Sequence, residues 1–253
     1  MNYPENKRLT IVVAAAGAGT RMKSFKPKAL VQIDNIPLIE ITCDKFFMTA
    51  DEFIVVIQKR QEEYFRKYLS PLYLSKIKFV YQEILSGTLG AISCALPVCR
   101  DENLVAVMWA DHIGLSNAKL SDFEKFIWSE SYDILVPIVK KDNPYTHIEY
   151  NERNLIYRFT ETRNLNYPIA HGNNDCGIFF LKGNKVRVEI IDYNKRLTSS
   201  STFPEVDTNF LSIFGKLNSI DIVAKELFDE TLTLGGNTIE ELQFNWAKIK
   251  KDL

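Results

Sequence analysis

The stretch that decides the fold runs from Leu9 to Lys28 and reads LTIVVAAAGAGTRMKSFKPK. Its first residues, Leu9–Val13, are apolar and mostly β-branched, which is typical of a parallel strand buried on both faces. The run Ala14–Gly19 contains only alanine and glycine, so its backbone can approach a ligand closely and offers unscreened N–H groups. Four cations then follow within eight positions, namely Arg21, Lys23, Lys26 and Lys28. A strand, a small-residue loop and fixed positive charge predict a triphosphate site.

The spacing excludes two other phosphate-binding loops. A Walker A loop has four residues between its glycines and then Gly-Lys-Ser/Thr, and this stretch has neither feature. The dinucleotide-binding fingerprint needs a third glycine that opens a helix, but Met22 stands there and the basic run continues. The two glycines alone would also fit an ordinary tight turn, so the prediction depends on the whole string.

That string, Gly17–Met22 followed by Lys26-Pro27-Lys28, resembles the signature of the sugar-nucleotide pyrophosphorylase family of nucleotidyltransferases, which couple an NTP to a phosphorylated small molecule. The resemblance covers essentially the whole chain and is strongest over residues 9–112. It implies an α/β fold with a Rossmann-like, mixed and mostly parallel sheet flanked by helices, the nucleotide-diphospho-sugar transferase type, with a small β-rich acceptor-binding extension. Since the chain ends at Leu253, we expect no acyltransferase domain of the kind that bifunctional relatives carry.

Length and composition are those of an ordinary globular protein, with 253 residues, 46% hydrophobic and 25% charged. A net charge of −1 argues against a polyanionic partner such as nucleic acid. No apolar stretch approaches membrane-spanning length, the polar N-terminus is unlike a signal peptide, and the four cysteines lack metal-site spacing. We therefore expect a cytoplasmic protein that acts on small molecules, without nucleic-acid or membrane partners. The oligomeric state stays open, with a homodimer as one option.

The pattern of elements changes near residue 133. Before it, strands alternate with helices on short connections, which implies right-handed crossovers and a mostly parallel sheet. The expected elements are strands at 53–57, 77–81 and 104–109 and helices at 37–50 and 62–69. After it come extended runs with little helix, at 134–139, 146–150, 155–160 and 176–181, and a predicted mobile loop at 194–203. We treat residues 1–253 as a single nucleotidyltransferase domain, with a nucleotide-binding half (about 1–132) and an acceptor-binding half (about 133–253).

The segment Gln82–Ala91 resembles the family's base-reading element, Gln-x4-Gly-Thr. The amide of Gln82 can donate and accept at once, which matches the mixed edge of a pyrimidine, and the backbone of Gly87 can add a hydrogen bond. Gln82 could equally be a polar strand end and Gly87-Thr88 a helix cap. The resemblance implies a pyrimidine NTP. The predicted nucleotide-binding residues are Ala14, Ala16, Gly17, Ala18, Gly19, Thr20, Gln82, Gly87, Thr88 and Ala110.

Two residues are candidates for binding Mg²⁺. Asp111 follows a buried strand, at the carboxyl end where parallel sheets bind ligands, and it resembles the family's metal-binding aspartate, although a helix cap is the alternative. Asn237 precedes the last expected helix and resembles the family's second metal ligand, with a plain N-cap as its alternative. Asp229 and Asp207 are the substitutes for Asn237.

Three elements of the second half resemble parts of the family's acceptor site. Glu161-Thr162-Arg163 resembles a Glu-x-Lys element whose acid holds an acceptor hydroxyl and whose cation faces the acceptor phosphate; arginine keeps the charge. Asp175-Cys176-Gly177 resembles Asn-x-Gly with a carboxylate in place of the amide. Tyr145-Thr146 stands where sugar enzymes carry an aromatic residue and glycine. The predicted acceptor-binding residues are His112, Thr146, Glu161, Arg163 and Asp175.

These departures from the family pattern bear on the substrate. Thr146 would narrow the space that a glycine leaves for a hexose, and Asp175 beside Glu161 would favour an acceptor that carries an amine. Alternatively, Asp175 is salt-bridged locally and the sugar shifts. We favour a cytidylyltransferase of the phosphocholine or phosphoglutamine type, serving capsule or surface polysaccharide biosynthesis. The alternatives are a sugar-1-phosphate uridylyl- or thymidylyltransferase and a non-catalytic nucleotide sensor.

The expected reaction is in-line attack by an acceptor phosphate oxygen on the α-phosphorus of the NTP, with pyrophosphate leaving. The nucleophile is already an anion, so catalysis consists of positioning and charge neutralisation. The resemblance implies two catalytic residues: Arg21 would stabilise the departing pyrophosphate, and Lys28 the α-phosphate and the attacking oxygen. A sensor would have no use for this set together with the two metal ligands.

Overall fold

The computed structural model describes residues 8–17, 26–101, 103–118, 126–128, 131–162, 165–199, 209–217 and 219–250. The elements of the first half are β1 (Leu9–Ala14), β2 (Gln32–Ile33), β3 (Ile36–Pro37), α1 (Leu38–Phe47), β4 (Glu52–Ile57), α2 (Glu62–Tyr68), α3 (Pro71–Leu74), β5 (Ile77–Tyr81), α4 (Gly87–Ala95) and β6 (Leu104–Trp109). The predicted strands of this half agree with the observed ones to within one residue at either end. The first long helix ends at Phe47, three residues before the predicted Ala50.

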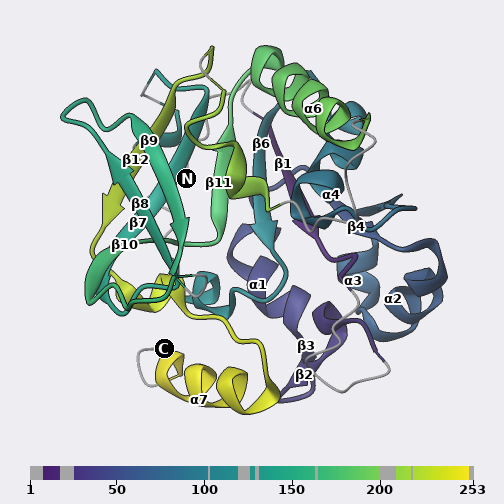
Figure 1. The fold of residues 1–253 in the computed structure, drawn as a ribbon. Coiled ribbons are helices and arrows are strands. Elements are labelled where there is room, and N and C mark those ends of the chain that lie inside the picture. Colours follow the sequence, from purple (N-terminus) through teal and green to yellow (C-terminus); the bar gives the residue numbers. More distant parts are fainter. Residues whose placement is uncertain are drawn as a thin grey trace.

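The second half contributes both strands and helices. Its elements are β7 (Ile134–Asp142), β8 (Thr146–Tyr150), β9 (Ile156–Glu161), β10 (His171–Asp175), β11 (Ile178–Leu181), α6 (Asn184–Ser199), β12 (Ile222–Leu227) and α7 (Ile239–Ile249). With the first half it forms an eight-stranded mixed sheet in the order β10-β7-β11-β6-β1-β4-β5, in which β12 pairs with β7 (Figure 1). The predicted α/β class, with a mixed sheet flanked by helices, is confirmed.

The parallel strands β1, β4 and β6 are buried on both faces, and β5 pairs with β4 as a partly exposed strand. Residues at alternate positions of β1 pack in opposite directions, Ile11 and Val13 with α1 and Val12 with α4. This alternation is the reason for the continuous apolar run in the sequence, because a strand buried on both faces has no solvent-facing position. Strand β11 pairs antiparallel with both β6 and β7 and so joins the two halves into one sheet.

The described residues between the extended runs at 134–181 contain little helix, as predicted, but the helix that follows them, α6, was not predicted. Helix α6 is 16 residues long and packs on α4 through its buried residues Val186 and Ile190. The predicted mobile loop is also wrong in part, because residues 194–199 belong to this helix, while residues 200–203 lie outside the described residues. The helical signal is present in the sequence, since Val186, Ile190, Tyr193 and Leu197 recur at helical spacing.

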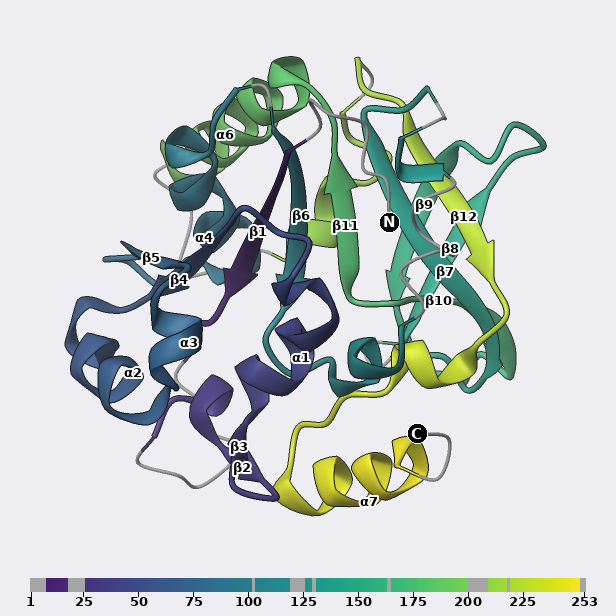
Figure 2. The ribbon, with the colours of Figure 1, turned by 180° about the vertical axis from the view of Figure 1, so that it is seen from behind.

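Helix α7 lies at the end of the sheet where β1 and β6 finish (Figure 2). Its buried residues Leu242 and Ile249 join a small cluster that includes Leu38 of α1 and Ile113, just after β6. The hairpin formed by β8 and β9 is a separate two-stranded sheet that packs beside β10. No helix in the described part of the chain is both long and apolar enough to cross a membrane.

Candidate functional site

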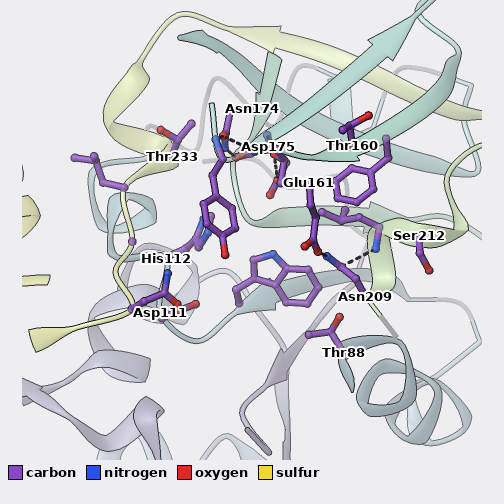
Figure 3. Close-up of a pocket in the computed structure, with 18 of the residues that line it drawn as sticks. Thr88, Asp111, His112, Thr160, Glu161, Asn174, Asp175, Asn209, Ser212 and Thr233 are labelled. Atoms are coloured by element: carbon purple, nitrogen blue, oxygen red, sulfur yellow. Dashed lines mark hydrogen bonds between the residues drawn. The ribbon is translucent and has the colours of Figure 1, made fainter. Parts of the chain in front are cut away.

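Two adjoining cavities lie at the carboxyl ends of β1 and β6. The first, called the small cavity here, has a volume of about 480 Å³ and lies between the loop after β1 and the start of α4. The second, the large cavity, has a volume of about 1210 Å³ and extends along β8, β9 and β10 to α6 and α7 (Figure 3). They share Thr88, Trp109 and Asp111 in their walls, so ligands in the two cavities would meet at this boundary.

The small cavity brings together every described residue of the predicted nucleotide-binding set. These residues are Ala14, Ala16, Gly17, Gln82, Gly87, Thr88 and Ala110. The other three, Ala18, Gly19 and Thr20, lie outside the described residues, as does the predicted catalytic residue Arg21. Lys28, the second predicted catalytic residue, lines the same cavity.

A buried glutamine that the sequence analysis missed supports the loop after β1. Gln58 follows β4, and its Nε2 donates a 2.7 Å hydrogen bond to the carbonyl of Ala16. The backbone N–H of Ala15 donates to Val56, so the loop leaves the sheet in a fixed direction. The available signal is a polar residue placed directly after the apolar run of β4.

Gln82 is fixed in the wall of the small cavity. It is 3% exposed, and its Nε2 donates a 3.1 Å hydrogen bond to the carbonyl of Gly87. Gly87 has a φ of +78°, a backbone conformation that favours glycine, and it is the first residue of α4 after the N-cap Ser86. A Cβ added to Gly90 would stand 2.8 Å from Gln82 Nε2, so glycine at this position allows the close packing of the amide. Sequence reasoning did not single out Gly90.

The two predicted metal ligands converge on one cation, the ammonium group of Lys28. Lys28 Nζ forms an ion pair with Asp111 and lies 3.4 Å from the amide oxygen of Asn237. The side chains of Lys28 and Asp111 are partly exposed, at 21% and 27%. Asp111 follows β6 and Asn237 precedes α7, so the packing of α7 at this edge brings them together.

The donor atoms at this point fit Mg²⁺. Carboxylate and amide oxygens are ligands for hard cations, and the site already holds a positive charge between them. Among the described residues, no group of three or more His, Cys, Asp and Glu side chains could hold a metal ion. Mg²⁺ commonly takes only one or two protein ligands and completes its coordination with water and substrate phosphates, so a pair of oxygens is sufficient.

The structure places the alternatives for the second metal ligand in different positions. Asn237 is not the N-cap of α7, because Thr238 has that position and its hydroxyl accepts from the N–H of Glu241. Asp229 caps the 3₁₀ turn after β12 by accepting from the N–H and the hydroxyl of Thr231, and it lines neither cavity. Asp207 lies outside the described residues.

Four of the five predicted acceptor-binding residues line the large cavity. They are His112, Thr146, Glu161 and Asp175. Figure 3 shows Glu161 and Asp175 on the side of the cavity formed by the second half of the chain. Arg163, the fifth residue, lies outside the described residues.

Asp175 and Thr146 act as one hydrogen-bonded unit. Asp175 is 3% exposed; its carboxylate accepts a 2.7 Å hydrogen bond from the hydroxyl of Thr146 and a 2.9 Å hydrogen bond from the N–H of Gly177. The alternative of a local salt bridge is therefore wrong among the described residues, where hydrogen bonds take its place. The Thr146 hydroxyl is turned toward this carboxylate.

Glu161 is held by Asn209, which sequence reasoning did not identify. The amide of Asn209 donates to Glu161 Oε1, and its carbonyl oxygen accepts from the N–H of Leu211. The next residue, Phe210, donates its N–H to the hydroxyl of Thr88 at 2.8 Å. One short segment therefore contacts both the wall between the cavities and the predicted acceptor-binding carboxylate (Figure 3).

His112 packs directly on a glycine. A Cβ at Gly177 would stand 1.9 Å from His112 Nδ1, and Gly177 has a φ of +68°, so space and backbone conformation both favour glycine. The Nδ1 atom is buried and has no hydrogen-bond partner among the described residues. His112 precedes the 3₁₀ turn Ile113–Asn117 and lines the large cavity.

Lysines line the large cavity as well, and they were not predicted. Lys141 and Lys248 lie toward α7, and Lys216 follows the 3₁₀ turn that begins at Phe210. Lys141 Nζ donates a 3.1 Å hydrogen bond to the hydroxyl of Thr233, and burial lowers the pKa of this lysine. The pair Lys140-Lys141 at the end of β7 was the available signal, because strand alternation turns one of two neighbours inward.

Comparisons with known proteins concern the family and the fold of this chain. Residues 11–172 match the model of the MobA-like NTP transferase domain family. Over 241 residues, 27% are identical to the bifunctional protein GlmU of Thermodesulfovibrio yellowstonii, which covers 92% of this chain and 50% of that protein. This chain therefore spans about half the length of that relative.

Solved structures show the same fold at low sequence identity. HddC from Yersinia pseudotuberculosis superposes with a TM-score of 0.64 at 18% identity, over 96% of this chain and 99% of that chain. The inositol-1-phosphate CTP transferase from T. maritima superposes with a TM-score of 0.65 at 15% identity, over 99% of both chains. At these identities the likeness concerns the fold alone.

Proposed function

We propose that this chain, which belongs to the MobA-like NTP transferase domain family, transfers a nucleotidyl group from a pyrimidine NTP to a phosphorylated small molecule and releases pyrophosphate. CTP is the favoured donor. The favoured acceptor is a phosphorylated amine or amino acid of the phosphocholine or phosphoglutamine type. The product would be a nucleotide-activated precursor for capsule or surface polysaccharide.

One observation carries the proposal: the two cavities meet at Asp111, where Lys28 also stands. A transferase of this class must bring the α-phosphate of one substrate to the phosphate of another, and a shared boundary provides the meeting point. The positive charge of Lys28 stands where two polyanions would repel each other. The small cavity supports the donor side, because Gln82 and Gly87 lie in its wall.

The residues of this chain would act by positioning and by electrostatics. Gln82 would read the pyrimidine, and the loop after β1 would hold the phosphates with its N–H groups. Lys28 would leave Asp111 to contact the α-phosphate and the attacking oxygen, and Arg21 would contact the leaving pyrophosphate. Glu161, oriented by Asn209, would bind the acceptor.

Asp111 and Asn237 would hold Mg²⁺ in place of the Lys28 ammonium group. The ion supplies charge neutralisation between the α-phosphate and the acceptor phosphate when bound. No proton transfer is needed at the nucleophile, because the acceptor phosphate is ionised at neutral pH, and this agrees with a site built from cations and amide donors.

A sugar-1-phosphate uridylyl- or thymidylyltransferase is the second candidate, and one observation favours it. The carboxylate of Asp175 is buried and already accepts hydrogen bonds from Thr146 and Gly177. A carboxylate used in this way supports the loop rather than an amine on the acceptor. The presence of Asp175 where the family has asparagine would then not prevent a sugar from binding.

The test is pyrophosphate release, measured with Mg²⁺ across a grid of substrates. The donors are CTP, UTP, dTTP, GTP and ATP; the acceptors are hexose 1-phosphates, phosphocholine and phosphorylated amino acids. We expect release with CTP and an acceptor that carries an amine, and much slower release from the Lys28→Met variant. Release with UTP or dTTP and a hexose 1-phosphate would favour the second candidate. If the protein binds nucleotide but releases pyrophosphate with no substrate pair, both transferase candidates are contradicted. The result would then favour a non-catalytic nucleotide sensor.

A further inference from the structure

Two lysines face the same end of the large cavity from different elements. Lys141 belongs to β7 and Lys248 to α7, and both line the cavity together with Thr233 and Asn245. On α7, the residues Glu241, Asn245 and Lys248 share one helix face, since they are spaced by four and three positions. The cavity end is therefore a built corner with two ammonium groups and polar neighbours.

The positive charge at this corner is not compensated by an ion pair. Within the described ranges, neither Lys141 nor Lys248 has a carboxylate within salt-bridge distance, although Glu230 lies near enough to stabilise the charge of Lys141. Burial and the neighbouring charge of Lys248 both lower the pKa of Lys141. Lys141 is half-buried, whereas Lys248 is exposed and its ammonium group lies over the ring of Phe244. Two neighbouring like charges favour an anion beside them.

The corner is separate from the point where the phosphates would react. Lys248 follows the first residue of α7, Ile239, by nine positions, which corresponds to about 14 Å along the helix axis. Asn237 lies before that helix, beside Lys28. Lys248 and Asn237 therefore lie toward opposite ends of α7.

We propose that Lys141 and Lys248 bind a carboxylate of the acceptor, distinct from the phosphate that receives the nucleotidyl group. This inference rests on the proposed function and narrows the acceptor to the phosphorylated amino acids. The phosphate would lie at Lys28 and Asp111, the carboxylate at Lys141 and Lys248, and the amine toward Glu161. A hexose 1-phosphate or phosphocholine would leave the two lysines without a partner.

The first experiment measures lysine acylation, site by site, and requires no turnover. The full chain with Mg²⁺ and CTP is treated with an N-hydroxysuccinimide ester, and peptides are quantified by mass spectrometry. The two probes are O-phosphoserine and O-phosphoethanolamine, which have the same amine and phosphate and differ by one carboxylate. We expect O-phosphoserine to slow acylation of Lys141 and Lys248 severalfold, and O-phosphoethanolamine to have little effect.

Lys140 is the matched internal control for this experiment. It is the neighbour of Lys141 on β7, but it is exposed, is paired with Glu226 and lines neither cavity. Its acylation should not respond to either probe. If both probes protect Lys141 equally, the lysines bind the phosphate. If neither probe protects it, the lysines bind neither the phosphate nor the carboxylate. Either result overturns the proposal.

The second experiment is kinetic and separates this inference from the proposed function. Lys141→Met should raise KM for the carboxylate-bearing acceptor by about tenfold or more, since it removes a charge-assisted hydrogen bond. KM for the NTP should not change, Lys141→Arg should restore most of the affinity, and Lys140→Met should match the wild type. If hexose 1-phosphates or phosphocholine are the best acceptors, the proposal of nucleotidyl transfer is supported, whereas the proposal of a carboxylate site is contradicted.

Discussion

Asn237 Oδ1 lies 3.4 Å from the Nζ of Lys28, although the two residues are 209 positions apart in the sequence. Asp111, 83 positions from Lys28, binds the same ammonium group. One lysine thus occupies the point where a carboxylate and an amide oxygen converge. In the proposed mechanism, Asp111 and Asn237 would hold a divalent ion at this point, and Lys28 would contact the substrate instead.

The first prediction concerns Lys28. Lys28→Met should lower turnover by about 10²-fold or more, because it removes a fixed charge from the developing transition state. The fold should survive, since the side chain is partly exposed and lines a cavity. Steady-state pyrophosphate release measures the effect, and Lys59→Met, an exposed lysine paired with Glu62, is the control. Near-normal turnover of Lys28→Met would contradict the assignment.

The second prediction concerns the metal ligands. Asp111→Asn and Asn237→Ala should each weaken divalent-ion binding by about tenfold or more, since the first removes the negative charge of one ligand and the second removes the oxygen donor of the other. Binding of Mn²⁺, followed by electron paramagnetic resonance with CTP present, gives a readout that does not depend on turnover. Asp229→Asn is the matched control, because Asp229 caps a turn away from both cavities. Loss of Mn²⁺ binding in the control alone would transfer the ligand role to Asp229.

The third prediction concerns the packing of Gln82 against α4. In Gly90→Ala, the new Cβ would stand 2.0 Å from Ser86 Oγ and 2.8 Å from Gln82 Nε2, so the amide must move. We expect a higher KM for the NTP and a loss of about 1–3 kcal/mol of unfolding free energy, which is typical of overpacking. Urea unfolding measures the second effect. If KM for the NTP is still higher in Gly90→Ala when the acceptor is saturating, the variant is defective in nucleotide binding. An unchanged KM for the NTP would contradict the role of Gln82 in base reading.

Much of the site is foreseeable from the sequence where a residue directly follows a buried strand. Asp111 and Gln82 are examples, because an apolar run locates the strand and the next polar side chain then lies at its carboxyl end. Asn209 could not be found in this way. It lies in a stretch without periodicity, and its importance comes from a contact with Glu161, 48 positions away, that only the folded chain creates.

Helix α6 was missed for another reason. The sequence analysis assigned only its last residues, to the mobile loop at 194–203, because the segment is polar at most positions and has buried residues only at Val186, Arg187 and Ile190. The buried Arg187 breaks the apolar pattern, yet its guanidinium donates to the carbonyls of Arg100 and Asn103. A charged residue in a core position is recognised from its partners, which the sequence does not display.

The fourth prediction concerns stability at alkaline pH. Burial raises the pKa of Cys99 to about 12 and also raises the pKa values of Cys43 and Cys176. In the unfolded chain these thiols ionise near pH 8.5. Their contribution to stability is therefore complete below that pH and is lost as pH rises from about 8.5 toward 12, because only the unfolded state can release the protons.

Urea unfolding at pH 7.5 and pH 9.5 measures this effect. Cys99→Ala should show a smaller decrease in unfolding free energy between the two pH values than the wild type, whatever the cost of the cavity at either pH. In the native protein the same thiols should react slowly with a disulfide reagent at pH 8, and half-buried Cys94 is the comparison. Rapid native labelling of Cys99 would contradict the prediction.

The fifth prediction decides which carboxylate of the large cavity recognises an amine. Asp175 accepts hydrogen bonds from Thr146 and Gly177 and is almost fully buried, whereas Glu161 is partly exposed and accepts a hydrogen bond from Asn209. We therefore expect Glu161→Gln to raise KM for an amine-bearing acceptor by about tenfold, the effect of losing a charged hydrogen-bond partner. Asp175→Asn should act mainly on stability, measured by urea unfolding. The reverse assignment of effects would make Asp175 the recognition group, and its bonds to Thr146 and Gly177 would then serve to hold it toward substrate.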